Sequence, residues 1–334
     1  MPEQSTFPQT VERFAKLHLR DYRAGLDLEL RQDNLRKFRK NEILLVSCLR
    51  NERFRMEFFR NYYKKLGVSH FLFVDNASDD GFADWAAQYD DVSVWWTDAS
   101  YKAAKFGMLW CNDLLRRHAS GRWAVVVDPD EFLVFPRSET RGLADLVEFL
   151  DEERRRCMHA VLLDAYSDRS LGETVLGDGD DPFALCPYFD RDGYIQQPGW
   201  GDATLIRGGP RMRVHFANAI QSAPALNKIP LVKWRPHFHF RSSTHDANPH
   251  FLNRANPAAK PAVTAALFHF KLIASLRDKS AEEIRRQQHY DGSREYRRYL
   301  EVEDERFYDP GISVRYEGSQ QLVDLGLMAP GRWF

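Results

Sequence analysis

The chain is poor in cysteine and has no long apolar run. Its four cysteines stand at positions 48, 111, 157 and 186, and no two of them form a Cys-x-x-Cys pair. This spacing argues against a disulfide framework or a cysteine zinc site and favours reduced thiols. No apolar run approaches the roughly 20 residues that span a bilayer, and residues 1–5 lack the charge and apolar block of a signal peptide. We therefore expect a cytoplasmic protein.

Neither sign of charge dominates the chain. Lys and Arg number 47 and Asp and Glu 48, which gives a formal net charge of -1. Dedicated nucleic-acid binders carry a net basic domain, so we expect no nucleic-acid partner. With 43% hydrophobic and 13% aromatic residues, the 334-residue chain can form one large domain or two modest ones, and it shows no internal repeat.

Short apolar runs alternate with segments of helical spacing from residue 43 onward. Runs rich in β-branched or aromatic residues predict strands, whereas apolar residues at helical spacing predict helices. The predicted strands are 43–49, 70–74, 92–96, 123–127 and 160–165, and the predicted helices are 54–66, 82–88, 102–118 and 143–156. Because strands alternate with helices, we predict an α/β fold with a mostly parallel central sheet.

Three carboxylates directly follow the predicted strand 123–127. They are Asp128, Asp130 and Glu131. Carboxylates crowded at the end of a core strand repel one another and lose hydration unless a cation or hydrogen-bond donors compensate. Mg²⁺ or Mn²⁺, which bind oxygen ligands, would compensate them. The alternative is a strand that ends in a solvated turn at Pro129, because Asp-x-Asp also occurs by chance.

Two more polar clusters, 50–52 and 75–80, also follow predicted strands. In open parallel sheets, ligands bind outside the carboxyl ends of the strands. These clusters and the 128–131 cluster are all expected at that edge. The sequence therefore predicts a binding site there.

The motifs at these strand ends point to a known family. They read Cys48-Leu-Arg-Asn-Glu52, Val74-Asp-Asn-Ala-Ser-Asp-Asp-Gly81 and Asp128-Pro-Asp-Glu-Phe132, with less specific matches at 228–234, 243–245 and 267–271. In this combination the chain resembles the family 2-like glycosyltransferases with a GT-A fold, in particular a bacterial branch with an Asp-x-Asp-Glu-Phe strand end.

The resemblance covers about residues 40–275 and implies a GT-A, Rossmann-like domain over 41–275. Its nucleotide-binding half would be 41–135 and its acceptor half 136–275. The loop-rich, acidic stretch 167–203 would be a lid or an acceptor-binding insert. The charged flanks, residues 1–40 and 276–334, are predicted as N- and C-terminal helical extensions. An arginine-rich surface on the N-terminal one is an alternative site for peripheral contact with the inner face of a membrane.

The resemblance also implies an activity. The protein would be a metal-dependent, inverting glycosyltransferase in surface or exported polysaccharide synthesis. Its partners would be a UDP- or GDP-sugar donor and a glycan or lipid-linked acceptor. A metal held by Asp128 and Asp130 would neutralise the charge that develops on the departing diphosphate.

Several residues are candidates for holding the donor. By the resemblance, Asp75 would bind the base or ribose of the nucleotide, in a pocket that is also lined by Arg50, Asn51 and Glu52. Asn76 belongs to the same cluster, although a simple turn role is open for it.

Three basic residues are candidates for holding phosphate. Lys105 lies on the predicted helix before the strand 123–127 and could reach a phosphate. A solvent-exposed lysine without a ligand is an equally good interpretation. Lys228 and Arg235 lie in a stretch of strand character and could hold the diphosphate or an anionic acceptor. The alternative for both is that the aliphatic part of the side chain packs on the protein while the charged group stays in solvent.

Histidines late in the chain are candidates for a third metal ligand, as GT-A enzymes often have one. The contenders are His245 and His269, although His269 lies in an apolar run and could be a core histidine. His237 and His239 share one face of a predicted strand, but His-x-His is not decisive without a third partner.

Inverting transfer needs a general base that takes the proton of the acceptor hydroxyl. Asp164, Asp168 and Asp202 all follow the metal strand, and we favour Asp168 because it comes shortly after a predicted strand. Asp246 is a further candidate.

Two other functions compete with glycosyl transfer. A sugar-phosphate nucleotidyltransferase shares the architecture and the metal carboxylates, but usually has a Gly-rich loop where this chain has Leu49-Arg-Asn-Glu52. A non-catalytic nucleotide-sugar-binding protein is the other alternative, and the presence of both Asp128 and Asp130 argues against it.

Overall fold

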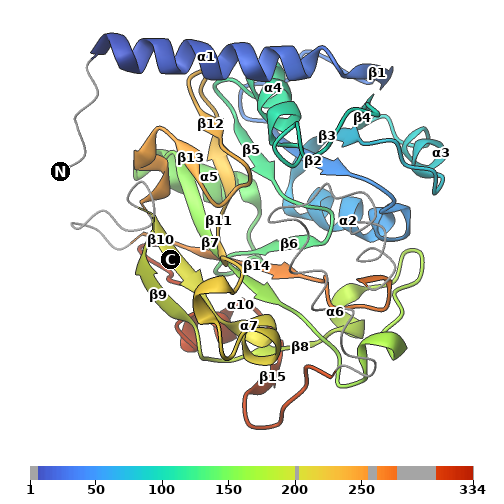
Figure 1. The fold of residues 1–334 in the computed structure, drawn as a ribbon, viewed down its shortest axis with the longest axis vertical. Helices are drawn as coiled ribbons and strands as arrows, with labels where there is room; N and C mark the ends of the chain where they lie inside the picture. Colours follow the sequence, from blue (N-terminus) through green and yellow to red (C-terminus); the bar gives the residue numbers. More distant parts are fainter. Residues whose placement is uncertain (1–6, 200–202, 255–261, 277–305, 334) are drawn as a thin grey trace.

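The computed structural model describes residues 7–199, 203–254, 262–276 and 306–333 (Figure 1). Its centre is a nine-stranded sheet with the order β1-β4-β3-β2-β5-β11-β7-β14-β6. The strands are β1 (Glu29–Gln32), β2 (Ile43–Leu49), β3 (Val68–Asp75), β4 (Val92–Trp96), β5 (Trp123–Val126), β6 (Glu131–Val134), β7 (Cys157–Asp164), β11 (Asn227–Lys233) and β14 (Ala265–His269).

Most strands of the central sheet run in one direction. β4, β3, β2 and β5 are neighbours in parallel pairs, and β7 and β14 share their direction. The opposite direction is taken by β1, β11 and β6. The predicted mostly parallel α/β sheet is thus confirmed, and its arrangement is consistent with Rossmann-like nucleotide-binding folds.

Helices cover both faces of the sheet because alternate residues of its strands point to opposite sides. In β2, Leu45 packs into the core under α2 (Arg53–Leu66), α3 (Phe82–Ala86) and α5 (Leu143–Glu152). Its neighbours Leu44 and Val46 pack on the other side, under α4 (Met108–His118). On that side α1 (Phe7–Gly25) packs against α4 (Figure 1).

The predicted strands and helices of the nucleotide-binding half are all present, but one helix begins later than predicted. The helix predicted from residue 102 begins only at Met108, because Lys105, Phe106 and Gly107 have positive φ angles, which a helix cannot contain. The N-terminal segment is not helical throughout: β1 follows α1 and pairs with β4 as an edge strand.

Short elements make up the acceptor half and the C-terminal segment. The predicted insert contains a 3₁₀ turn (Leu171–Glu173), α6 (Pro182–Leu185), β8 (Tyr188–Asp190) and β9 (Ile195–Pro198). After it come β10 (Thr204–Arg207), α7 (Gly209–His215), a 3₁₀ turn (Ile220–Ser222), β12 (His239–Phe240), β13 (Ala247–Asn248) and a 3₁₀ turn (His250–Asn253).

The described part of the C-terminal extension is only partly helical. β15 (Ser313–Arg315) pairs with β8, and α10 (Ser319–Asp324) follows it. Leu322 and Trp333 are buried in the larger core, and the Trp333 indole donates a hydrogen bond to the carbonyl of Pro136 at 2.6 Å. This part of the extension therefore packs on the main domain. No helix in the described ranges is both long and apolar enough to cross a membrane.

Candidate functional site

The predicted polar clusters meet at one edge of the sheet. Leu49 of β2 pairs with Asp75 of β3, and Val46 pairs with Val126 of β5. The chain segments that leave these three strands therefore lie side by side.

The loop that carries Asp128 and Asp130 joins β5 to β6, which lies at the far margin of the sheet. Because β6 pairs with β14, Glu131 stands opposite His269. Because β14 also pairs with β7, His269 stands opposite Asp164. This register brings three ionisable residues from three strands to one level of the sheet.

His269 bridges two aspartates. Its Nδ1–H donates to Asp164 Oδ1 at 2.7 Å, while its Nε2 faces Asp130 Oδ2 at 3.4 Å. Burial lowers the pKa of His269, but the carboxylates of Asp130 and Asp164 outweigh it and raise the pKa to about 9. In this state the imidazole is charged at neutral pH and joins the two carboxylates.

Asp164 is fully buried and held from its other side as well. The Arg211 guanidinium donates from Nε to Asp164 Oδ2 at 2.7 Å. Although burial raises the pKa of this carboxyl, Arg211 and His269 together hold the pKa of Asp164 below its usual value. Arg211 was not among the residues predicted from the sequence. No local motif marks it, because it lies 47 residues from its partner in the chain.

Lys228 neutralises the other carboxylates of the cluster. From β11 its Nζ lies 2.7 Å from Glu131 Oε1 and 3.4 Å from Asp128 Oδ2. Burial raises the pKa of Glu131, and the Lys228 ammonium opposes that rise. Burial lowers the pKa of Lys228, but Glu131 and Asp128 raise it above its ordinary value. The Asp128 side chain is itself 50% exposed, so it can reach a ligand from solvent.

His245 lies beside this cluster. Its Nδ1–H donates to the carbonyl of Asn227, the residue before Lys228. Burial lowers the pKa of His245 to about 3, and the charges of Lys228, Arg211 and His269 add to the effect. The ring is therefore neutral, and Nε2 carries the lone pair.

The residues after β2 and β3 brace one another. Arg50 donates to the carbonyls of Asn76 and Ala77, both at 2.7 Å. The Asn51 side chain accepts from the backbone N–H of Asp79 at 3.0 Å. These bonds hold the two loops together as one wall of the edge.

Within this wall the candidates differ in what they can still bind. The Asp75 carboxylate is buried and accepts from the Ser78 N–H at 2.9 Å, and burial raises its pKa. The Asn76 amide donates to the carbonyls of Thr97 and Ala99. In this structure its side chain therefore holds the backbone of a neighbouring segment. Glu52 pairs with the buried Arg55 at 2.7 Å.

Lys105 lies exposed at the same edge. It belongs to the turn segment 101–107, whose Gly107 packs so closely on Cys48 of β2 that an added Cβ would lie 2.8 Å from Cys48 Sγ. The contact places the turn over the carboxyl end of β2. Whether Lys105 reaches a phosphate stays a prediction.

The structure does not bring Arg235 to this edge. β11 runs antiparallel to β5, and Lys233 pairs with Trp123, where β5 begins. Lys228 and Arg235 are thus at opposite edges of the sheet. The prediction that Arg235 lies at the donor site is therefore wrong. His239 is also remote: it is buried against Asp21 of α1 at 2.9 Å.

The candidate bases differ in accessibility. Asp168 is exposed, four residues past the end of β7, whereas Asp164 is enclosed by Arg211 and His269. Asp202 lies outside the described residues. Asp246 pairs with Arg241 at 2.9 Å.

The carboxylates and the imidazole at this edge are of the kinds that bind a divalent cation. In this structure they form ion pairs and hydrogen bonds with neighbouring side chains. Among the described residues, no group of three or more His, Cys, Asp or Glu side chains is arranged to hold a metal. Asp128 turns towards Lys228, and Asp130 towards His269. Two carboxylates and an imidazole oriented by a further carboxylate are nevertheless ligands that Mn²⁺ accepts.

Comparisons with known proteins leave the family open. No protein-family model matches the chain, and comparison with curated proteins finds no match. Among solved structures, the chain is similar to a crystal structure of 4-diphosphocytidyl-2C-methyl-D-erythritol synthase. The identity is 12%, the TM-score is 0.29, and the match covers 58% of this chain and 74% of that one. A likeness at this score carries no argument for fold or function.

Proposed function

We propose that the protein is a metal-dependent glycosyltransferase of the GT-A, family 2-like type. It would transfer a sugar from a UDP- or GDP-sugar to a hydroxyl of a glycan or lipid-linked acceptor. The observation that carries the proposal is the Asp164–His269–Asp130 arrangement beside Asp128. A carboxylate that holds one imidazole nitrogen is the usual support of a metal-binding histidine, and here the other nitrogen faces Asp130, which would be a second ligand.

The chemistry follows from the charges at this edge. Departure of the sugar adds one negative charge to a diphosphate that is already charged, and cations close by stabilise it. Asp128, Asp130 and His269 would hold the metal, which supplies Lewis-acid stabilisation of that diphosphate. Lys228, whose Nζ lies 3.4 Å from Asp128, adds a buried positive charge next to it. His245 is retained as an alternative metal ligand because its ring is neutral.

The acceptor side would supply the base. Asp168 is the accessible carboxylate after β7, so it remains the favoured base for inverting transfer. Asp164 is better suited to a positioning role, because Arg211 and His269 already occupy both of its oxygens.

The first test is isothermal titration of UDP and GDP with and without Mn²⁺, combined with a mass-spectrometric screen of UDP- and GDP-sugars for release of the nucleoside diphosphate. We expect metal-dependent binding and turnover that Asp130→Asn abolishes while the fold persists. Asp324→Asn, a change at an exposed aspartate of α10, is the matched control and should have no effect. Metal-independent binding, or unchanged turnover in Asp130→Asn, would refute the proposal.

The same assay separates the competing enzyme class. A nucleotidyltransferase would release pyrophosphate from a nucleoside triphosphate and a sugar phosphate, and would leave nucleotide sugars intact. Asp164→Asn provides a finer readout for the glycosyltransferase. If Asp164 orients His269, this variant should weaken the binding of Mn²⁺, titrated without nucleotide, about 10- to 100-fold.

A further inference from the structure

A cavity lies at the edge of the sheet opposite the candidate site. It encloses about 220 Å³ and is lined by Leu150, Arg154, Arg155, Arg156, Cys157, His159, Phe251, Arg254, Ala262 and Val263. Cys157 begins β7, and Asp164 of the candidate site ends the same strand. A strand rises about 3.3 Å per residue, so the two places lie on the order of 20 Å apart.

The cavity is strongly basic. Four of its lining residues are arginines, and none of the described lining residues is acidic. Two acidic residues near the cavity face other cations: Asp151 binds Lys233 at 2.6 Å, and Glu153 lies 3.8 Å from Arg332. Within the described ranges, neither Arg154 nor Arg156 forms an ion pair with a carboxylate.

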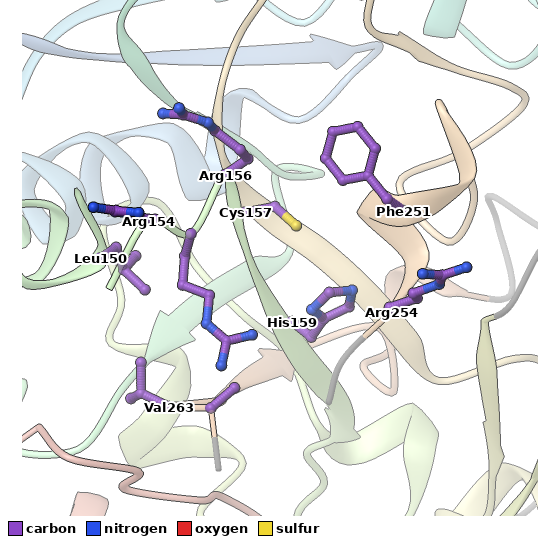
Figure 2. A pocket seen from close by; sticks show the side chains of 10 residues that line it. Leu150, Arg154, Arg156, Cys157, His159, Phe251, Arg254 and Val263 are labelled. Atoms are coloured by element: carbon purple, nitrogen blue, oxygen red, sulfur yellow. The ribbon is translucent and has the colours of Figure 1, made fainter. Parts of the chain in front are cut away.

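The arginines stand around an apolar and neutral floor. Figure 2 shows Arg154 and Leu150 on one side of the cavity and Arg254 and Phe251 on the other. His159 lies between the two sides in the same view. The floor therefore offers apolar contact, and the rim offers positive charge.

The polar groups of the floor are already satisfied. His159 Nε2–H donates to the carbonyl of Leu252 at 2.9 Å, and the Cys157 thiol donates to the same carbonyl at 3.3 Å. Burial and, to a smaller extent, the charge of Arg155 lower the pKa of His159 to about 4. The histidine is therefore neutral and does not compete with the arginines for an anion.

Phe251 adds an apolar surface at the rim. Its side chain is 48% exposed, and its ring contacts Phe238 edge-on at 5.9 Å. A large, half-exposed aromatic ring next to arginines offers a contact for the apolar part of an anionic ligand. Together with Leu150 and Val263 it gives the cavity an apolar side that inorganic phosphate alone would leave uncovered.

We propose that this cavity binds a small phosphate ester, with its phosphate at the arginine rim and its organic group against Leu150, Phe251 and Val263. Arginine binds phosphate oxygens through paired N–H donors, which a carboxamide cannot replace. The volume, below the roughly 300 Å³ at which drug-sized pockets begin, suits a compact ester. The site is separate from the candidate donor site.

The test uses phenyl phosphate and inorganic phosphate as probes, measured by isothermal titration with the full chain. We expect phenyl phosphate to bind with one-to-one stoichiometry and more tightly than inorganic phosphate. Arg154→Gln combined with Arg156→Gln should weaken both probes at least about tenfold. Phe251→Ala should weaken phenyl phosphate alone.

Two controls make the outcome specific. Arg315→Gln removes an exposed arginine of β15 and should change nothing. Asp130→Asn should leave phenyl phosphate binding intact, which separates this site from the donor site. The proposal is overturned if neither probe binds at millimolar concentration, or if Arg315→Gln weakens binding as much as the paired substitution.

The phosphate could come from a soluble metabolite or from a lipid headgroup. Vesicles that contain phosphatidic acid distinguish the two sources. If the vesicles bind the protein and the paired arginine substitution releases it, the phosphate belongs to a lipid. If phenyl phosphate binds and the vesicles do not, the ligand is soluble.

Discussion

Replacing Lys228 by methionine should destabilise the protein by about 3–5 kcal/mol at alkaline pH. Lys228 and Glu131 are both buried, and Nζ lies 2.7 Å from Oε1. With an effective dielectric constant of about 20, the gross attraction at that distance is roughly 6 kcal/mol. Desolvation of the two groups offsets much of this attraction in the intact pair. Loss of one partner leaves the other charge buried and unpaired.

The pH dependence of this cost identifies its source. Burial raises the pKa of Glu131 above its ordinary 4.5, and Lys228 opposes that rise. Without Lys228 the pKa rises further, so the folded variant protonates Glu131 at higher pH than the unfolded chain does. A carboxyl whose pKa is raised by folding stabilises the folded state, and this stabilisation is complete below the unfolded-state pKa of 4.5. It is lost as the pH rises through the folded-state pKa. The difference between the variant and the wild type should therefore be small in acid and large in alkali.

Urea unfolding at about pH 5 and about pH 8.5 measures this difference. Lys233→Met is a matched control on the same strand, because Lys233 pairs with Asp151 where both side chains are partly exposed. That control should cost less than about 1 kcal/mol. The double change Lys228→Met with Glu131→Gln should recover most of the loss. If Lys228→Met at alkaline pH costs no more than Lys233→Met, the buried pair is not what stabilises this edge.

Two further predictions concern stability away from the carboxylates. Burial lowers the pKa of His70 to about 4 from 6.5, so the folded protein should lose up to about 3 kcal/mol relative to His70→Gln as the pH falls from 6.5 towards 4, measured by urea unfolding. A constant difference between the two proteins over that range would contradict a neutral buried histidine. Gly107→Ala should cost more than Gly121→Ala, because both glycines have positive φ but only Gly107 would place a Cβ 2.8 Å from Cys48 Sγ. Equal melting temperatures for these two variants would show that the contact with Cys48 relaxes at no cost.

The sequence alone was sufficient for most elements of the nucleotide-binding half, although it did not predict β6. Its strands and helices follow from apolar periodicity, which depends only on neighbouring residues. The start of α4 was predicted too early because the backbone at Lys105, Phe106 and Gly107 is set by the close packing on Cys48. That contact joins residues that are distant in the chain, so periodicity cannot report it.

The edge position of Asp128 and Asp130 was also predictable, because parallel strands that follow one another along the chain bring their carboxyl ends to one edge. The direction of β11 could not be predicted from the sequence. Its antiparallel course moves Arg235 to the opposite edge and leaves Lys228 among the carboxylates.

The sequence by itself thus determined that an α/β sheet ends in a row of carboxylates that need positive charge. Only the tertiary structure decided which cations supply that charge. Lys228, His269 and Arg211 come from segments distant from their partners. Pairing between distant strands depends on register and packing over the whole sheet, and local residue patterns do not encode it.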